Sequence, residues 1–238
     1  MIMGMDGEAF DSGIYNKNQE MYAHELEKLM SQYPEGVLLS PEYAQWVQEN
    51  QIRLLIRLAR YKFVAKLLKP SDSLLEVGCG SGLGTIFLGQ HCANAKGIDV
   101  KQSEISEARQ LNQRENVSFA HMDLFEAPLD EKFDVVVSLD VIEHLTVEQG
   151  RRLISEQVRR LKPGGMLVVG SPSVWSYPHQ SPISQASDIQ CYDLPELLGL
   201  VDDFVERSIS FSMNDEMIHT GHHKMAWYYM VVGFGTRI

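Results

Sequence analysis

Three glycines, Gly78, Gly80 and Gly82, follow the acidic residue Glu76 at the end of a short apolar run. Glycine is required where a backbone turns sharply or where a ligand must touch the main chain. The pattern predicts a buried strand, a turn that can hold a ligand against its backbone, and a helix that begins near Thr85. A tight turn that binds nothing is the alternative.

A second acidic residue, Asp99, ends the next β-branched run, 23 residues after Glu76. A carboxylate at this place can accept hydrogen bonds from both hydroxyl groups of a ribose. Leu83 stands where the fingerprint Gly-x-Gly-x-x-Gly has its third glycine, so a dinucleotide pyrophosphate is disfavoured. The loop and Asp99 together predict a cofactor site that contacts a ribose.

Residues 140–145, with the sequence Asp-Val-Ile-Glu-His-Leu, directly follow another expected strand, 133–139. A doubly wound parallel sheet presents such residues to its ligand crevice. His144 is our first choice for a catalytic base, because an imidazole can exchange a proton near neutral pH. The alternative is that Glu143 and His144 shape the cofactor pocket.

A second polar cluster contains His219, His222 and His223, with Asp215 and Glu216 just before them. Histidines and carboxylates can bind a divalent metal, but this spacing matches no metal-ligand signature and we expect no metal. We expect the loop to line the acceptor side of a site, with His219 or His222 as alternative bases and His223 in contact with substrate. A solvated loop is the other interpretation.

Aromatic and basic side chains could recognise a substrate. Trp175, Tyr177 and His179 lie in a segment rich in Ser and Pro, where aromatic faces suit sugar rings or flat aromatic molecules. Packing of this segment against the core is the alternative.

Arg53, Arg57 and Arg60 are spaced i, i+4, i+7, which places three cations on one helix face. Guanidinium groups bind phosphates and carboxylates, so the arginines could hold an anionic acceptor. A solvated or acid-paired face is the alternative.

The elements that position these residues alternate between short β-branched runs and helical stretches from residue 73 onward, which is typical of βαβ units. We expect strands at 74–77, 96–99, 117–121, 133–139, 166–170, 204–211 and 225–233. The predicted fold is α/β: a Rossmann-like, doubly wound, mostly parallel sheet of seven strands with an antiparallel last strand.

The first 70 residues read as helical, with a break at Pro34 and Gly36 and a second helix from about residue 41 to Lys69. We expect residues 1–70 to form a helical cap or lid and residues 71–238 to form the cofactor domain. Insertions at 171–192 and 212–224 are expected to build the acceptor site.

The order of these motifs resembles the class I S-adenosylmethionine (SAM)-dependent methyltransferase family. The first motif of that family is an acidic residue followed by Gly-x-Gly-x-Gly, as at Glu76 to Gly82. The resemblance continues at 97–99, 121–124, 133–139 and 161–165, and so covers residues 73–170. It implies SAM as the cofactor and S-adenosylhomocysteine as the product.

The resemblance also implies roles for particular residues. Glu76 and the three glycines would meet the methionine part of SAM, Asp99 the ribose, Asp123 the adenine amine and Leu124 the adenine ring. The neighbouring residues assigned to the same site are Cys79, Val100 and Leu139. A capping aspartate in a turn is the alternative for Asp123.

The expected activity is methyl transfer from SAM to a hydroxyl of a small molecule, such as a sugar, a nucleotide-linked sugar or a natural-product intermediate. N-methylation of a small amine and O-methylation of a quinone are the nearest alternatives. A non-catalytic SAM-binding module is a third, and an NAD-dependent oxidoreductase is disfavoured by Leu83.

The composition limits the partners. The 238 residues carry a formal net charge of −11, which argues against nucleic-acid or anionic-membrane binding. We expect a cytoplasmic enzyme with a small-molecule acceptor, and a homodimer is compatible with the sequence.

The charge is unevenly distributed along the sequence. Residues 51–70 form a basic segment with six bases and no acid, although the net charge of the whole sequence is negative. The three cysteines show no metal-binding spacing, so reduced thiols are expected.

Overall fold

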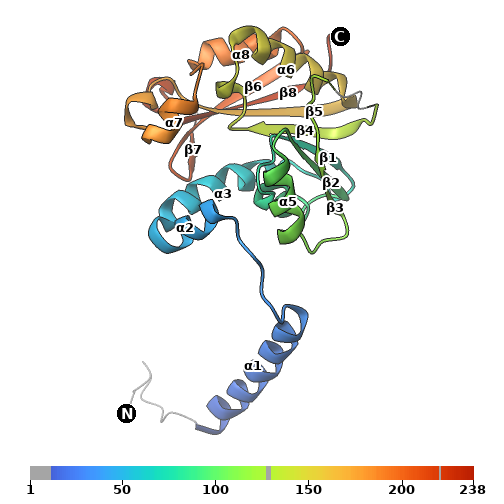
Figure 1. The fold of residues 1–238 in the computed structure, drawn as a ribbon, viewed down its shortest axis with the longest axis vertical. Helices are drawn as coiled ribbons and strands as arrows, with labels where there is room; N and C mark the ends of the chain where they lie inside the picture. Colours follow the sequence, from blue (N-terminus) through green and yellow to red (C-terminus); the bar gives the residue numbers. More distant parts are fainter. Residues whose placement is uncertain (1–11, 127–129, 220) are drawn as a thin grey trace. The chain divides into compact units, whose positions relative to one another are not determined.

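The computed structural model describes residues 12–126, 130–219 and 221–238 (Figure 1). The chain divides into two compact units, Met1–Leu38 and Leu39–Ile238. The described part of the first unit contains the helix α1 (Ser12–Gln32), on which Lys28 and Glu25 form an ion pair at 2.7 Å. Among the described residues, no helix is long and apolar enough to cross a membrane.

The second unit is built on one eight-stranded sheet with the strand order β3-β2-β1-β4-β5-β8-β6-β7. The strands are β1 (Ser73–Val77), β2 (Asn94–Asp99), β3 (Val117–His121), β4 (Phe133–Leu139), β5 (Leu161–Pro172), β6 (Arg207–Asn214), β7 (Met217–His219) and β8 (Tyr228–Phe234). Strands β1 to β5 pair in parallel, and β8 is antiparallel to both β5 and β6. The predicted α/β fold with an antiparallel last strand is therefore confirmed.

Helices cover the sheet and carry the site residues. They are α2 (Pro41–Glu49), α3 (Gln51–Ala65), α4 (Leu83–Leu88), α5 (Gln102–Leu111), α6 (Val147–Arg159), α7 (Pro182–Ser187) and α8 (Leu194–Asp202), with the short 3-10 helices η1 (Ile142–His144), η2 (Tyr177–His179) and η3 (His223–Met225).

Side chains that alternate along the strands form two cores, one on each face of the sheet. Leu74, Val135 and Val168 pack in one cluster with residues of α3, α4 and α5, while Leu75 and Val136 pack in the other with residues of α6 and α8. Figure 1 shows these two groups of helices on opposite sides of the sheet. The central parallel strands β1 and β4 are buried on both faces, as is typical of a parallel sheet covered by helices.

Two expectations about the number of elements are wrong. The sheet has eight strands rather than seven, because Met217–His219 pairs with β6 inside the segment 212–224 that was expected to be a loop. The expected helix from residue 41 to Lys69 is two helices. Asn50 separates them: its side chain accepts a hydrogen bond from the Arg53 backbone N–H, and its own N–H bonds to Trp46.

Several strand boundaries also differ from the expected ones. The sixth strand begins at Arg207 rather than 204, because Phe204 still bonds to Val201 in the turn that follows α8. The last strand begins at Tyr228 rather than 225, because Met225 belongs to η3. Boundaries depend on local turn bonds that hydrophobic patterns do not reveal.

The division between the two compact units falls after Leu38. The helices α2 and α3 therefore lie in the same unit as the sheet, where α3 buries Tyr61 and Val64. That residues 1–70 act as a lid stays a prediction.

Candidate functional site

The glycine loop after β1 forms the wall of a cavity. Gly78, Gly80 and Gly82 all have positive φ, a region that side chains with a Cβ rarely adopt. A Cβ on Gly78 would lie 2.4 Å from Cγ2 of Val141, whereas the nearest atom to a Cβ on Gly80 is Oε2 of Glu104 at 3.8 Å. The backbone at Gly78 is thus packed closely, and Gly80 faces open space.

Asp99 stands at the end of β2 beside this loop. Its Oδ2 accepts a hydrogen bond from the Gly80 backbone N–H at 3.0 Å, and its Oδ1 accepts one from the Lys101 N–H at 2.8 Å. The carboxylate therefore holds the loop in place, and it also lines the cavity.

The cavity next to the loop has a volume of about 690 Å³. Six residues expected to bind the cofactor line it: Gly78, Gly80, Asp99, Val100, Asp123 and Leu124. Five further lining residues are Glu42, Tyr43, Arg57, Lys101 and Glu104. The sequence pattern did not assign these five to the cofactor, and only Arg57 carried a signal, as a member of the arginine triplet.

Four other residues expected at the cofactor site lie behind the cavity wall. Cys79 and Leu139 are 3% and 1% exposed and belong to the hydrophobic core. A Cβ on Gly82 would lie 2.6 Å from Ala108, so this glycine serves packing between α4 and α5. Burial raises the pKa of the Cys79 thiol, which makes it unreactive.

Glu76 is the fourth of these residues. Its buried carboxylate accepts hydrogen bonds from the Tyr61 hydroxyl at 2.8 Å and from the Thr85 hydroxyl at 2.5 Å. Burial raises the pKa of Glu76 to about 7, and the two hydrogen bonds act in the opposite direction. Glu76 thus joins α3 and α4 to β1.

Asp123 lies in the turn that follows β3. Its Oδ1 caps the following turn by accepting a hydrogen bond from the Phe125 N–H at 2.8 Å, and the residue also lines the cavity. A capping bond to one carboxylate oxygen leaves lone pairs on the other, so contact with an adenine amine stays a prediction.

Asp140 follows β4 and has a φ of 57°, which is unusual for a residue other than glycine. Its carboxylate bonds to Arg57 at 2.7 Å and to Arg60 at 2.7 Å, and both arginines come from α3. These cations hold the pKa of Asp140 below its usual range against the opposing effect of burial. The guanidinium of Arg60 also lies 3.7 Å from the ring centroid of Tyr228.

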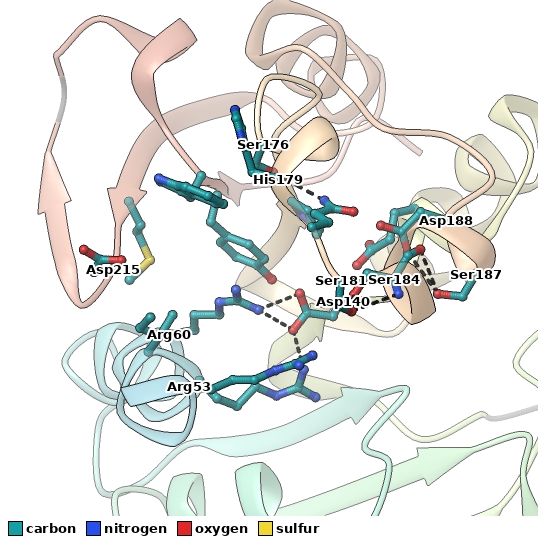
Figure 2. Close-up of a pocket in the computed structure, with 18 of the residues that line it drawn as sticks. Arg53, Arg60, Asp140, Ser176, His179, Ser181, Ser184, Ser187, Asp188 and Asp215 are labelled. Carbon is teal, nitrogen blue, oxygen red and sulfur yellow. Dashed lines mark hydrogen bonds and ion pairs between the residues drawn. The ribbon is translucent and has the colours of Figure 1, made fainter. Parts of the chain in front are cut away.

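A second cavity, of about 490 Å³, lies on the other side of Asp140. Figure 2 shows Asp140 between the arginines of α3 and the segment that carries Ser184, Ser187 and Asp188. Five residues line both cavities: Glu42, Arg57, Asp140, His144 and Ser187. The two cavities therefore meet at the end of β4.

His144 stands at this junction. Its Nδ1 lies 3.1 Å from the carbonyl oxygen of Ser187 and 3.4 Å from Oδ1 of Asp188. The neighbouring Glu143 is buried, and burial raises its pKa well above the usual value, with the charge of Asp140 adding to the effect. Glu143 is thus expected to hold a proton, whereas His144 lies at the cavity wall.

The three arginines expected to bind an anion all line the second cavity, but they differ in their partners. Arg57 and Arg60 bond to Asp140, which is the acid-paired alternative. Arg53 lies over the Trp46 ring at 4.8 Å and makes no ion pair among the described residues. Arg53 is thus the arginine best suited to an anionic group.

Of the three aromatic residues expected to contact substrate, His179 lines the second cavity, with its ring 5.8 Å from that of Trp227. Trp175 bonds through Nε1 to Asp193, and the Tyr177 hydroxyl bonds to the carbonyl of Gln185. Trp175 and Tyr177 therefore pack the segment against its own neighbours, and neither is among the cavity-lining residues.

The histidine cluster lies away from both cavities in the part of the chain that can be described. The Nε2 of His223 lies 3.2 Å from Asp193, and its carbonyl accepts a bond from the Tyr229 hydroxyl. The His222 ring lies 5.6 Å from the His223 ring. The side chain of His219 and all of Thr220 lie outside the described residues. Within the described residues, no group of three or more metal-binding side chains occurs.

Comparisons with known proteins agree on a family. Residues 75–169 match the family model of a methyltransferase domain. The chain is 32% identical over 141 residues to a "Probable S-adenosylmethionine-dependent methyltransferase" of Mycolicibacterium smegmatis, a match that covers 57% of this chain and 53% of that protein. It is 30% identical to a ubiquinone biosynthesis O-methyltransferase of Rickettsia bellii, over 54% of this chain and 57% of that one.

A further relative, nodulation protein S of Rhizobium tropici, is 34% identical over 43% of this chain and 44% of its own length. The chain thus spans about half the length of the curated relatives that it matches. The crystal structure of the N-methyltransferase NodS from Bradyrhizobium japonicum has the same fold, with a TM-score of 0.57 at 21% identity over 77% of this chain and 88% of that one.

The order of the strands, the glycine loop beside Asp99 and these matches define the class. Residues 75–169 thus carry a methyltransferase domain, and the chain is similar to SAM-dependent methyltransferases in sequence and to the NodS N-methyltransferase in fold.

Proposed function

We propose that this protein transfers a methyl group from SAM to a hydroxyl group of a small molecule. The observation that carries the proposal is the meeting of the two cavities at His144, Asp140 and Arg57. The cavity beside the glycine loop suits the cofactor, and the cavity beyond Asp140 suits the acceptor. A group that reacts with both partners must lie where the two cavities join.

The side chains that line the first cavity offer the hydrogen-bond acceptors and the apolar surface that SAM requires. Asp99 and Asp123 offer carboxylate oxygens for ribose hydroxyls and an adenine amine, and Val100 and Leu124 offer apolar surface for the ring. Arg57 also lines this cavity, and one of its guanidinium nitrogens is paired with Asp140. A guanidinium in this position suits the carboxylate of the methionine part.

SAM supplies, when bound, a methyl group on a positively charged sulfur that is already activated for displacement. The residues of this chain must therefore align the acceptor and remove its proton. Alignment of reactants can lower a barrier by roughly 7–11 kcal/mol. His144 is placed to take the proton, because it lines both cavities.

The acceptor cavity supports a polyhydroxylated substrate such as a sugar or a nucleotide-linked sugar. Its wall combines aromatic rings with hydroxyl and amide groups: Trp46, Trp227, Asn50, Ser176, Gln180, Ser181 and Ser184. Aromatic faces and hydrogen-bonding groups together are what a sugar ring requires. Arg53 could receive a phosphate or carboxylate of such a molecule.

N-methylation of an amine is the second candidate. The acceptor cavity also contains the carboxylates of Glu42, Asp188 and Asp215, which would attract a protonated amine. The NodS structure is that of an N-methyltransferase, whereas the Rickettsia relative is an O-methyltransferase. A protonated amine has no lone pair for the displacement and must first lose a proton, which it releases more readily than a hydroxyl group does.

Calorimetry with SAM, S-adenosylhomocysteine and NAD tests the cofactor. We expect binding of the first two and none of NAD, and the opposite result would falsify the proposal. Transfer of a radiolabelled methyl group to nucleotide sugars, phosphorylated metabolites, phenols and amines then tests the acceptor.

His144→Ala tests the base. For a hydroxyl acceptor we expect kcat to fall by roughly 10²–10⁴-fold with SAM affinity unchanged. His91→Ala is the matched control, because His91 is exposed and lies outside both cavities. A loss confined to SAM affinity would show that His144 only shapes the cofactor pocket.

A further inference from the structure

The segment that follows α7 is bonded to the turn that carries His144. The backbone N–H groups of Ile189 and Gln190 both donate to the carbonyl oxygen of Glu143, at 2.7 and 2.9 Å. At the junction of α7 with this segment, the carbonyl of Ser187, the last residue of α7, and the carboxylate of Asp188 face Nδ1 of His144. These contacts fix one short stretch of chain against another that is more than 40 residues away in sequence.

The contact with Ser187 determines which nitrogen of the His144 ring carries the proton. A backbone carbonyl can only accept a hydrogen bond, so the Nδ1 that lies 3.1 Å from it must be the donor. A neutral imidazole with its proton on Nδ1 has its lone pair on Nε2. The ring is therefore held in the form in which Nε2 can act as a base.

Asp188 adds a carboxylate to this arrangement. Its side chain is 3% exposed, and its Oδ1 lies 3.4 Å from Nδ1 of His144. Its Oδ2 has no hydrogen-bond partner among the described residues. A buried carboxylate is unfavourable unless a charge or a donor compensates for lost water. The partner next to Asp188 that can become positively charged is His144.

We propose that Asp188 is a positioning residue, which orients the His144 ring and stabilises the positive charge that the ring acquires when it takes a proton. The proposal rests on the proposed function, in which His144 is the base. Asp188 would act through His144 and would not itself touch the reacting atoms. It lies in the segment 171–192, which the sequence linked only to acceptor recognition.

The proton balance of the reaction explains why this carboxylate is useful. As the acceptor oxygen forms its bond to the methyl carbon, its proton moves to Nε2 of His144, and the electron pair of the broken C–S bond stays on sulfur. The sulfonium charge is lost and an imidazolium charge appears on His144. A nearby carboxylate stabilises that new charge without becoming protonated itself.

Other titratable or charged groups lie around the pair of His144 and Asp188. Asp140 and Glu143 lie on the side of β4 and η1, the thiol of Cys191 follows on the same segment as Asp188, and Arg57 and Arg60 lie on α3. Burial raises the pKa of Asp188, while His144 lowers it. The carboxylate of Asp188 therefore lies where it can stabilise the imidazolium that forms when His144 takes a proton.

Nuclear magnetic resonance of the histidine rings tests the pair without any acceptor. The His144 signals would be assigned with His144→Ala and followed from pH 5 to 9 in the wild type, Asp188→Asn and Asp188→Ala. We expect the titration of His144 to move to lower pH in both Asp188 variants. Asp203→Asn, which changes an exposed carboxylate paired with Arg151, is the matched control and should leave His144 unchanged. An unchanged His144 titration in both Asp188 variants overturns the proposal.

Kinetics tests the catalytic consequence, with the best hydroxyl acceptor found in the screen. Asp188→Asn should lower kcat about tenfold or more, leave SAM affinity unchanged and shift the acid limb of the kcat profile to lower pH. A change in acceptor KM alone, with the pH profile intact, would mean that Asp188 only supports the loop. If His144→Ala keeps full kcat while the ring titration still responds to Asp188→Asn, the pair exists and the assignment of the base is what fails.

Discussion

The carboxylate of Asp140 accepts a hydrogen bond from Arg57 at 2.7 Å, and this contact joins α3 to the end of β4 where the two cavities meet. Arg60 bonds to the same carboxylate. Two cations from one helix thus hold a residue whose backbone is in the left-handed region. The contact explains how the wall between the two cavities is kept in place.

Asp140→Asn is expected to destabilise the fold at neutral pH by about 3 kcal/mol, because it leaves two largely buried guanidinium groups without their charge partner. Asp140→Ala should destabilise it by about 1 kcal/mol more, because alanine tolerates a positive φ less well than asparagine. Urea denaturation of the three proteins measures both differences. Equal stability of the wild type and Asp140→Asn would contradict the role of the ion pairs.

The destabilisation caused by Asp140→Asn is expected to depend on pH. The arginines lower the pKa of folded Asp140, so its contribution to stability is present above the pKa of an unfolded aspartate and is lost as pH falls. The difference in unfolding free energy between the wild type and Asp140→Asn should therefore shrink in acid. A difference that stays constant from pH 7 down to pH 3 would argue against a charge effect.

Glu76→Gln, unlike Asp140→Asn, is expected to stabilise the fold relative to the wild type at alkaline pH. Because burial raises the pKa of folded Glu76 to about 7, from 4.5 for an unperturbed carboxyl, ionisation of this group destabilises the fold as pH rises between these values. The variant should be similar to the wild type near pH 5 and gain melting temperature relative to it at pH 8. Glu131→Gln, at an exposed ion pair with Lys96, should show no such gain.

Two substitutions, Gly78→Ala and Gly164→Ala, distinguish two reasons why a position requires glycine: a positive φ and a lack of space for a Cβ. Both positions have a φ near 75°, at 74° and 77°, so both substitutions carry similar backbone strain. Only at Gly78 would the new Cβ meet another atom closely, Cγ2 of Val141 at 2.4 Å, whereas nothing lies within 4 Å at Gly164. We expect Gly164→Ala to destabilise the fold by about 1 kcal/mol, and Gly78→Ala to destabilise it more and to weaken SAM binding, as measured by thermal unfolding and calorimetry. Similar losses in the two variants would show that backbone strain alone matters.

Arg53→Ala tests recognition of an anionic acceptor. Arg53 makes no ion pair among the described residues and lines the second cavity, so its loss should raise KM for a phosphorylated or carboxylated acceptor by about tenfold. Loss of its contact with the Trp46 ring should lower stability by no more than about 1 kcal/mol. Lys62→Ala, which removes an exposed cation from the same helix, is the control. An unchanged KM for such acceptors would remove Arg53 from the substrate site.

Much of the fold could be predicted because its signals are local. The β-branched runs and the glycine loop each depend on a few neighbouring residues, and the strands and the turn that they predict are present in the structure. The errors arose where local bonds compete with a hydrophobic pattern, as at Asn50, or where a short hairpin strand lies in a polar segment, as at Met217–His219.

In the candidate site, too, the features that depend on local sequence could be predicted, and those that depend on contacts between distant segments could not. The sequence by itself determined the strand, the glycine loop and the acidic residues that line the cavity beside that loop, because βα turns place such residues at one edge of a parallel sheet. It could not tell that Glu76 turns into the core, that Trp175 and His223 meet Asp193, or that Asp140 binds Arg57 across 83 positions. Only the tertiary structure brought Asp188 to His144, because contacts between distant segments depend on how the whole chain packs and on no periodicity within either segment.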